Sequence, residues 1–93
     1  MKNTITPEKL EKYFSITGKA LKIAKKKIAK GKEEDAKEII EMVENYVSDA
    51  KYFREKQDFV NSFAALNYAH GWLDTGSRLG IFDVKDNKLF VIK

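Results

Sequence analysis

Between residues 7 and 79, apolar residues recur every three or four positions, a spacing that places them on one face of an α-helix. The pattern divides into three segments, residues 7–30, 33–56 and 58–79, and we predict one amphipathic helix for each. The apolar positions of the three segments are, in order, Leu10, Phe14, Thr17, Leu21, Ala24 and Ile28; Ala36, Ile39, Ile40, Val43, Tyr46, Val47, Ala50 and Phe53; and Phe59, Phe63, Leu66 and Leu73.

Residues typical of helix ends stand at the segment boundaries. Thr6 is a suitable N-cap, and Pro7 fits the first helical position, where its missing N–H leaves no bond unmade. Gly31 is suited to the left-handed conformation that often follows a helix, and Gly80 has the corresponding place after the third segment. Asp58 is the predicted N-cap of the third helix.

The links between the predicted helices are short, so consecutive helices must run antiparallel. We therefore predict an all-α fold, an up-and-down three-helix bundle that forms one domain over residues 1–93. The last segment, 81–93, has apolar residues on both sides of an Asp-Asn pair, which predicts a short extended or hairpin tail. A single hairpin is marginally stable alone, so the tail is expected to pack on the bundle or on a second chain.

The third segment is apolar on two sides, which is more than a three-helix bundle can bury. Besides the core face, Ala65, Tyr68, Trp72 and Leu79 form a second apolar face nearly opposite the first. Exposed patches of this kind usually mark interfaces, so we expect a homodimer or a protein partner at this face, with the chain's own tail as the alternative cover. Two further apolar residues lie among the lysines of the first helix and need the same kind of cover: Ile16 and Ile23.

A narrow polar line on the third segment is the candidate site. It contains Asn67, His70, Asp74 and Arg78, and residues four apart on a helix can touch. A histidine oriented by a carboxylate beside an arginine suits acid–base chemistry or an anionic ligand such as a nucleotide. A half-buried network that fixes the helix is the commoner role for such residues, and neither a nucleophile nor a second carboxylate pair accompanies them. We therefore assign no catalytic residue and expect a protein that is not an enzyme.

Charge is segregated along the chain, since residues 7–32 contain nine Lys and two Glu, and residues 33–58 contain nine acidic and four basic residues. The lysines that end the first helix and the acidic residues that start the second lie where the helix dipoles favour them, by about 0.3–1 kcal/mol each. Antiparallel packing also sets the basic helix beside the acidic one. Nucleic-acid binding is therefore not expected. The weaker alternative is contact with an RNA backbone through five lysines of the first helix: Lys12, Lys19, Lys22, Lys26 and Lys30.

The composition excludes several kinds of site. The chain has no Cys and one His, and without HExxH or ExxH spacing it lacks the usual ligands of a zinc or di-iron centre, so no metal and no cofactor is expected. No apolar run approaches the ~18 residues of a membrane span, and the residues after Met1 are polar, unlike those of a signal peptide. We expect a cytoplasmic protein.

The segment FVNSFAALNYAHGWLDTGSRLGIFDV, residues 59–84, resembles the signature region of an archaeal family, domain-of-unknown-function family 357. The resemblance extends over most of the chain, because the family also has a lysine-rich first helix and an acidic second one. It implies a closed three-helix bundle with a left-handed twist, in an archaeal and cytoplasmic protein. The resemblance implies a domain that occurs alone or joined to nucleotidyltransferase-like domains, which implies an accessory role near nucleotide chemistry, but the family has no established catalytic residues to transfer. Thr75 and Ser77 stand where similar sequences have Ala or Gly, which leaves the predicted fold unchanged.

Overall fold

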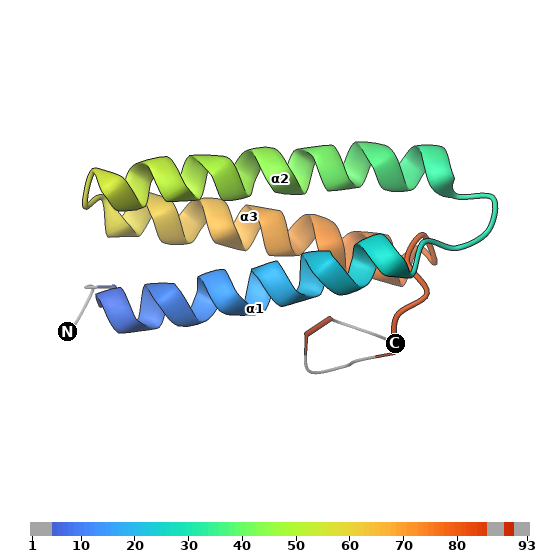
Figure 1. The fold of residues 1–93 in the computed structure, drawn as a ribbon, viewed down its shortest axis with the longest axis horizontal. Helices are drawn as coiled ribbons and strands as arrows, with labels where there is room; N and C mark the ends of the chain where they lie inside the picture. Colours follow the sequence, from blue (N-terminus) through green and yellow to red (C-terminus); the bar gives the residue numbers. More distant parts are fainter. Residues whose placement is uncertain (1–4, 86–88, 91–93) are drawn as a thin grey trace.

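Three antiparallel helices form an elongated bundle, with the chain running up, down and up again (Figure 1). The computed structural model describes residues 5–85 and 89–90. The helices are α1 (Pro7–Lys26), α2 (Glu33–Glu55) and α3 (Phe59–Arg78). The predicted all-α bundle is therefore confirmed. Over the described part of the chain, no helix combines the length and the apolar character needed to cross a membrane.

The starts of α1 and α3 follow the predicted capping chemistry. The Thr6 hydroxyl accepts a hydrogen bond from the Lys9 amide at 3.1 Å, and Pro7 occupies the first helical turn. At α3, the Asp58 carboxylate accepts a hydrogen bond from the Asn61 amide at 3.2 Å. Each cap satisfies a backbone N–H that has no partner inside its helix, a contribution of about 1 kcal/mol.

The end of α1 differs from the prediction, because the helix stops at Lys26 and does not continue to about residue 30. The residues that follow are extended and pair with the tail, with one antiparallel bridge between Ile28 and Phe82. Two backbone hydrogen bonds flank this bridge: the Ala29 amide donates to the Ile81 carbonyl at 2.9 Å, and the Asp83 amide donates to the Lys27 carbonyl at 2.7 Å. These bonds replace the helical ones that residues 27–30 would otherwise form.

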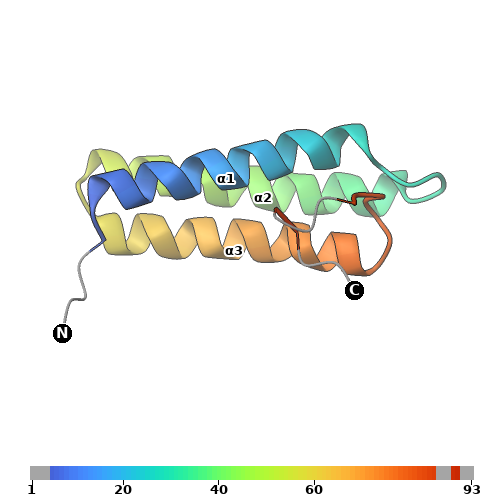
Figure 2. The same cartoon turned by 90° about the horizontal axis from the view of Figure 1, so that it is seen from below.

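The described part of the tail packs on its own bundle, in the groove between α1 and α3 (Figures 1 and 2). Four tail residues are buried in the core cluster at this end of the molecule: Ile81, Phe82, Val84 and Phe90. Phe82 lies directly against Gly76 of α3, where the missing side chain makes room for the ring. The turn of the predicted hairpin, at Asp86 and Asn87, lies outside the described residues.

α3 is the central helix, because it packs along α2 and also carries most of the contact with α1. Small buried residues bring α2 and α3 together, and the Ser62 hydroxyl donates to the Ala50 carbonyl at 2.6 Å. α1 and α2 touch less and are joined mainly at the surface by two ion pairs: Lys25 with Glu44 at 2.5 Å, and Arg54 with Glu11 at 2.8 Å. The basic first helix and the acidic second helix therefore do meet side by side.

We predict that Gly76→Ala destabilises the protein by about 1–3 kcal/mol, the range found when a close-packed core must admit an extra methyl group. A Cβ at this position would lie 2.5 and 2.7 Å from two carbons of the buried Phe82 ring and 3.3 Å from Ile39. Urea unfolding monitored by circular dichroism measures the change.

The matched control is Gly18→Ala in the middle of α1, where an added Cβ meets nothing within 4 Å. That substitution should stabilise the protein by up to about 1 kcal/mol, because Ala favours a helix over Gly. Equal stabilisation by both substitutions would show that Phe82 does not lie against Gly76.

Candidate functional site

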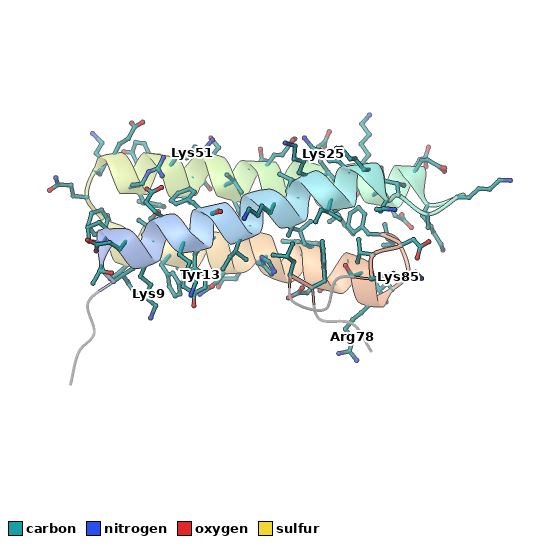
Figure 3. The ribbon with its side chains drawn as sticks, turned by 60° about the horizontal axis from the view of Figure 1, so that its bottom comes forward. Lys9, Tyr13, Lys25, Lys51, Arg78 and Lys85 are labelled. Carbon is teal, nitrogen blue, oxygen red and sulfur yellow. The ribbon has the colours of Figure 1, made fainter. Side chains whose placement is uncertain are left out.

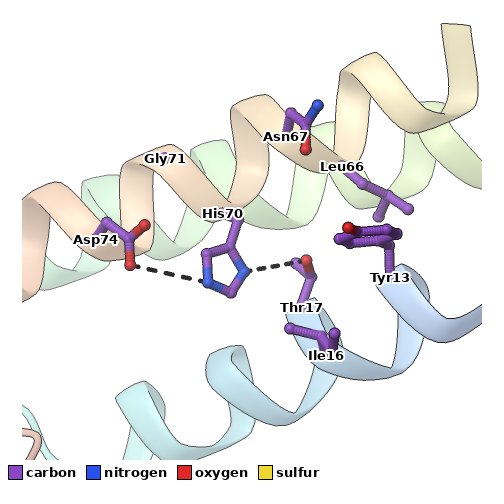
Figure 4. Close-up of a pocket in the computed structure, with 8 residues that line it drawn as sticks. All are labelled: Tyr13, Ile16, Thr17, Leu66, Asn67, His70, Gly71 and Asp74. Carbon is purple, nitrogen blue, oxygen red and sulfur yellow. Dashed lines mark hydrogen bonds and ion pairs between the residues drawn. The ribbon is translucent and has the colours of Figure 1, made fainter. Parts of the chain in front are cut away.

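His70 joins three parts of the molecule at the centre of the candidate site (Figure 4). It lies on α3, and its Nδ1 atom is 3.2 Å from the hydroxyl of Thr17 on α1. Its Nε2 atom is 2.6 Å from the carbonyl oxygen of Leu89 in the tail and 3.8 Å from a carboxylate oxygen of Asp74. One imidazole therefore contacts α1, the tail and its own helix.

These partners determine where the imidazole carries its proton. A carbonyl oxygen can only accept a hydrogen bond, so Nε2 must donate to Leu89. In the neutral ring Nδ1 is then the acceptor, and it accepts a hydrogen bond from the Thr17 hydroxyl. Both ring nitrogens are therefore engaged, and in this arrangement His70 has no free lone pair with which to act as a general base.

A cavity of about 250 Å³ opens beside His70, between α1 and α3. Eight residues line it: Tyr13, Ile16, Thr17, Leu66, Asn67, His70, Gly71 and Asp74. Its apolar part consists of Ile16, Leu66 and the Tyr13 ring, and its polar groups come from α3, apart from Thr17 on α1 (Figure 4). Pockets for cofactors and drug-sized ligands are about 300–1,000 Å³, so this cavity is suited to a smaller molecule or to one side chain.

The structure brings three of the four residues of the polar line to this cavity. Asn67, His70 and Asp74 line it, with the Asn67 side chain exposed at its rim. Arg78 does not line it, and its side chain points away from the bundle (Figure 3). The helical period explains this result, because Arg78 is one turn beyond Asp74 and α3 has by then reached its last residue. The cavity therefore lacks Arg78, the cationic residue that was expected to bind an anionic ligand.

The sequence did not indicate the partners of His70 on other elements. Thr17 and Tyr13 come from α1, and the Leu89 carbonyl belongs to a segment for which a side-chain pattern says nothing. One signal was present, since Thr17 was the only polar residue in the apolar stripe of the first helix. A buried hydroxyl needs a partner, and His70 is that partner.

The second apolar face of the third segment is largely exposed. The exposed fractions are 63% for Tyr68, 38% for Trp72 and 66% for Leu79, whereas Ala65 is only 7% exposed. The prediction for Ala65 was wrong, because α2 packs against that side of α3 and draws Ala65 into the core cluster with Ala50. We call the remaining surface the outer face of α3 and define it by five residues: Val60, Ala64, Tyr68, Trp72 and Leu79.

A shallow hollow adjoins the outer face of α3, at the groove that α3 forms with α2. It has a volume of about 210 Å³. Its lining consists of Tyr46, Asp49, Phe53, Asn61, Ala64, Ala65 and Tyr68. The rings of Tyr46 and Tyr68 stack at 5.5 Å between centroids, so the hollow has one rigid aromatic wall.

Ile16 and Ile23, the other two predicted interface residues, lie apart from this face. Ile23 packs against the core cluster that contains the tail, and Ile16 lines the cavity beside His70. Both are half-buried. Ile23 therefore has cover within its own chain, and Ile16 belongs to the cavity beside His70 and not to the hollow beside Tyr68. The five lysines considered for RNA are all exposed on α1 or in the following loop.

We predict that His70→Ala destabilises the protein by about 1–3 kcal/mol, because it removes the hydrogen bonds that His70 forms with the Thr17 hydroxyl and with the Leu89 carbonyl. Hydrogen exchange should become faster at the Ala29 and Asp83 amides, because their hydrogen bonds join the loop after α1 to the tail. His70→Gln should recover part of the protection, since its amide nitrogen can still donate to the tail. If exchange at these amides is unchanged in His70→Ala, the histidine does not hold the tail.

Comparison with known proteins places most of the chain in one family. The model of a family described as Protein of unknown function (DUF357) matches residues 12–82, which include all of α2 and α3 and most of α1. No curated protein and no solved structure matches the chain. The match covers residues 59–82 of the segment that carried the resemblance and continues from there to residue 12. The chain belongs to the DUF357 family of proteins of unknown function.

Proposed function

We propose that this protein is a non-enzymatic helical module that acts by binding protein through the outer face of α3. The observation that carries the proposal is the exposure of large apolar side chains on this face, above all Tyr68 and Trp72. Tyr and Trp are the residues most often found at the energetic centre of protein interfaces. They offer a large contact area with few rotatable bonds, so little conformational entropy is lost when they are covered.

The absence of charge over the first three quarters of this helix supports the same proposal. Residues 59–73 contain no Asp, Glu, Lys or Arg, in a chain of which 34% is charged. A solvent-facing helix surface normally carries charged residues. Interface cores, by contrast, are depleted of charge and enriched in aromatic residues. The composition of α3 therefore matches a surface that another protein covers.

The position of the tail adds a third argument. The described tail residues bury themselves between α1 and α3, on the side of His70. The outer face of α3 adjoins α2, on the side of α3 away from His70 and the tail. The tail residues that the structure describes therefore leave Tyr68 and Trp72 uncovered.

The test replaces Tyr68 with the photo-crosslinking amino acid p-benzoylphenylalanine in cells that produce the protein. We expect a discrete crosslinked product at position 68, which mass spectrometry then identifies, and its loss when Trp72→Ala is added. The control places the same amino acid at Lys37, an exposed residue of α2 among charged neighbours. If positions 68 and 37 crosslink equally, the outer face of α3 is not a binding surface.

A second candidate function is binding of a small polar or aromatic molecule in the cavity beside His70. Its support is the convergence of Asn67, His70 and Asp74 on one cavity with the Tyr13 ring in its wall. Screening of small aromatic amides and amines by NMR should shift the backbone amide signals of Asn67 and Asp74.

The matched variant for this second candidate is Ile16→Trp, which fills the mouth of the cavity from a half-buried position on α1. It should abolish the shifts and leave the fold intact. Shifts that persist in the variant, or that lie outside the cavity lining, would contradict a site at this place.

A further inference from the structure

We infer that the partner of the outer face of α3 is a second copy of this chain, with the two α3 helices antiparallel across a two-fold axis near Tyr68. The inference rests on the proposed function and specifies its partner. Three features of the described residues carry it: the charges at the ends of α3, the shape of the surface around its middle, and the size of the face. In a two-fold contact the same patch occurs on both sides, so the surface must be complementary to its own copy in each of these features.

The first feature is the arrangement of charge along α3. A charged patch that meets its own copy brings like charges together, whereas residues 59–73 bring none. Formal charge returns toward the ends, with Asp58 as the N-cap and Arg78 in the last turn, whereas Asp74 lies at the cavity beside His70. Tyr68 is equidistant from Asp58 and Arg78 along the chain, so an antiparallel pair centred on it sets Arg78 of each copy level with Asp58 of the other. This register overlaps the two helices over all but one residue, and it also sets opposite charges at the same level.

The second feature is the match between a protruding side chain and a hollow. Ala64 and Trp72 are also equidistant from Tyr68, so the same register sets Trp72 of one copy opposite Ala64 of the other. Ala64 lines the hollow of about 210 Å³ between α2 and α3. Trp72 follows Ala65, which lines the hollow, by seven residues, so helical spacing places it on the same α2 side of α3 as the hollow. A two-fold axis keeps both on the same side of the contact. Each copy therefore offers one indole and one hollow that receives it.

The third feature is the size of the face, which sets the expected strength of the contact. α3 is about 30 Å long, and together with the adjoining edge of α2 the face is roughly 20 Å wide. The contact would then bury on the order of 600 Å² per copy, somewhat below the ~800 Å² of a typical stable complex. We therefore expect a reversible dimer with a dissociation constant in the micromolar range.

Light scattering of the wild-type chain, from low micromolar to millimolar concentration, tests the inference. The expected result is a monomer that becomes a dimer as the concentration rises. The disrupting variant is Gly71→Glu, at an exposed residue of α3 one helical turn from Tyr68 that also lines the cavity beside His70, and where an added Cβ meets nothing within 4 Å in the single chain. A glutamate there should preserve the fold and raise the dissociation constant at least about tenfold, because the contact must bury its charge.

Gly18→Glu is the matched control, since it makes the same change at an equally open helical glycine on α1. It should leave the dissociation constant within about twofold of the wild-type value. Arg78→Glu tests the register, because it sets two acidic groups together and should weaken the dimer, whereas Lys85→Glu makes the same charge change in the tail and should not.

Two results would overturn the inference: a monomer at every concentration, or a dimer that Gly71→Glu and Gly18→Glu affect equally. A dimer that Gly71→Glu disrupts and that Arg78→Glu and Lys85→Glu affect equally would overturn the register. Failure of the inference and failure of the proposed function remain distinguishable. A monomeric protein that still gives a specific crosslink from position 68 in cells has another partner at this face, and one that gives none has no partner there.

Discussion

The contact between the Phe82 ring and Gly76 is the constraint on which the arrangement of this molecule depends. The ring fills the space left by the absent side chain of Gly76 and is almost completely buried. Phe82 also forms the antiparallel bridge with Ile28, so its position determines where α1 must give way to extended backbone. One aromatic residue of the tail therefore sets the length of α1, the path of the following loop and the side of α3 on which the tail lies.

The two sides of α3 acquire different roles because of this contact. On the α1 side, the tail extends the core, and His70 ties α1, α3 and the Leu89 carbonyl together. On the other side, the groove with α2 stays open, and Tyr68 and Trp72 are exposed beside it. His70 and Trp72 are only two residues apart, yet His70 belongs to a packed hydrogen-bonded network and Trp72 to an exposed surface.

Much of the fold could be predicted from the sequence because local physical chemistry determines it. The caps at Thr6 and Asp58 and the apolar stripes depend only on residues within a few positions. The end of α1 could not be predicted in this way, because its hydrogen-bonding partners are tail residues far along the chain. The same limit applies to Ala65, since a helical wheel shows two apolar sides but not how wide an arc two neighbouring helices will bury.

The candidate site shows the same division between local and distant information. Helical spacing predicted that His70 lies beside Asp74. It could not predict that Thr17 would bind Nδ1 and the Leu89 carbonyl would bind Nε2, because both belong to distant parts of the chain. Arg78 falls outside the cavity although its spacing from Asp74 allowed a contact. The exposed aromatic surface could be predicted more directly, because the third segment contains more apolar residues than one buried helix face can hold, and that excess can be counted in the sequence.

Acrylamide quenching of tryptophan fluorescence over a range of protein concentrations tests the central claim most directly, because Trp72 is the only tryptophan in the chain. We predict efficient quenching in dilute solution, where the outer face of α3 is open, and weaker quenching at high concentration, where a second copy covers it. Poor quenching already in dilute solution would mean that the chain covers Trp72 itself. Quenching that is efficient and independent of concentration would mean that no second copy covers this face.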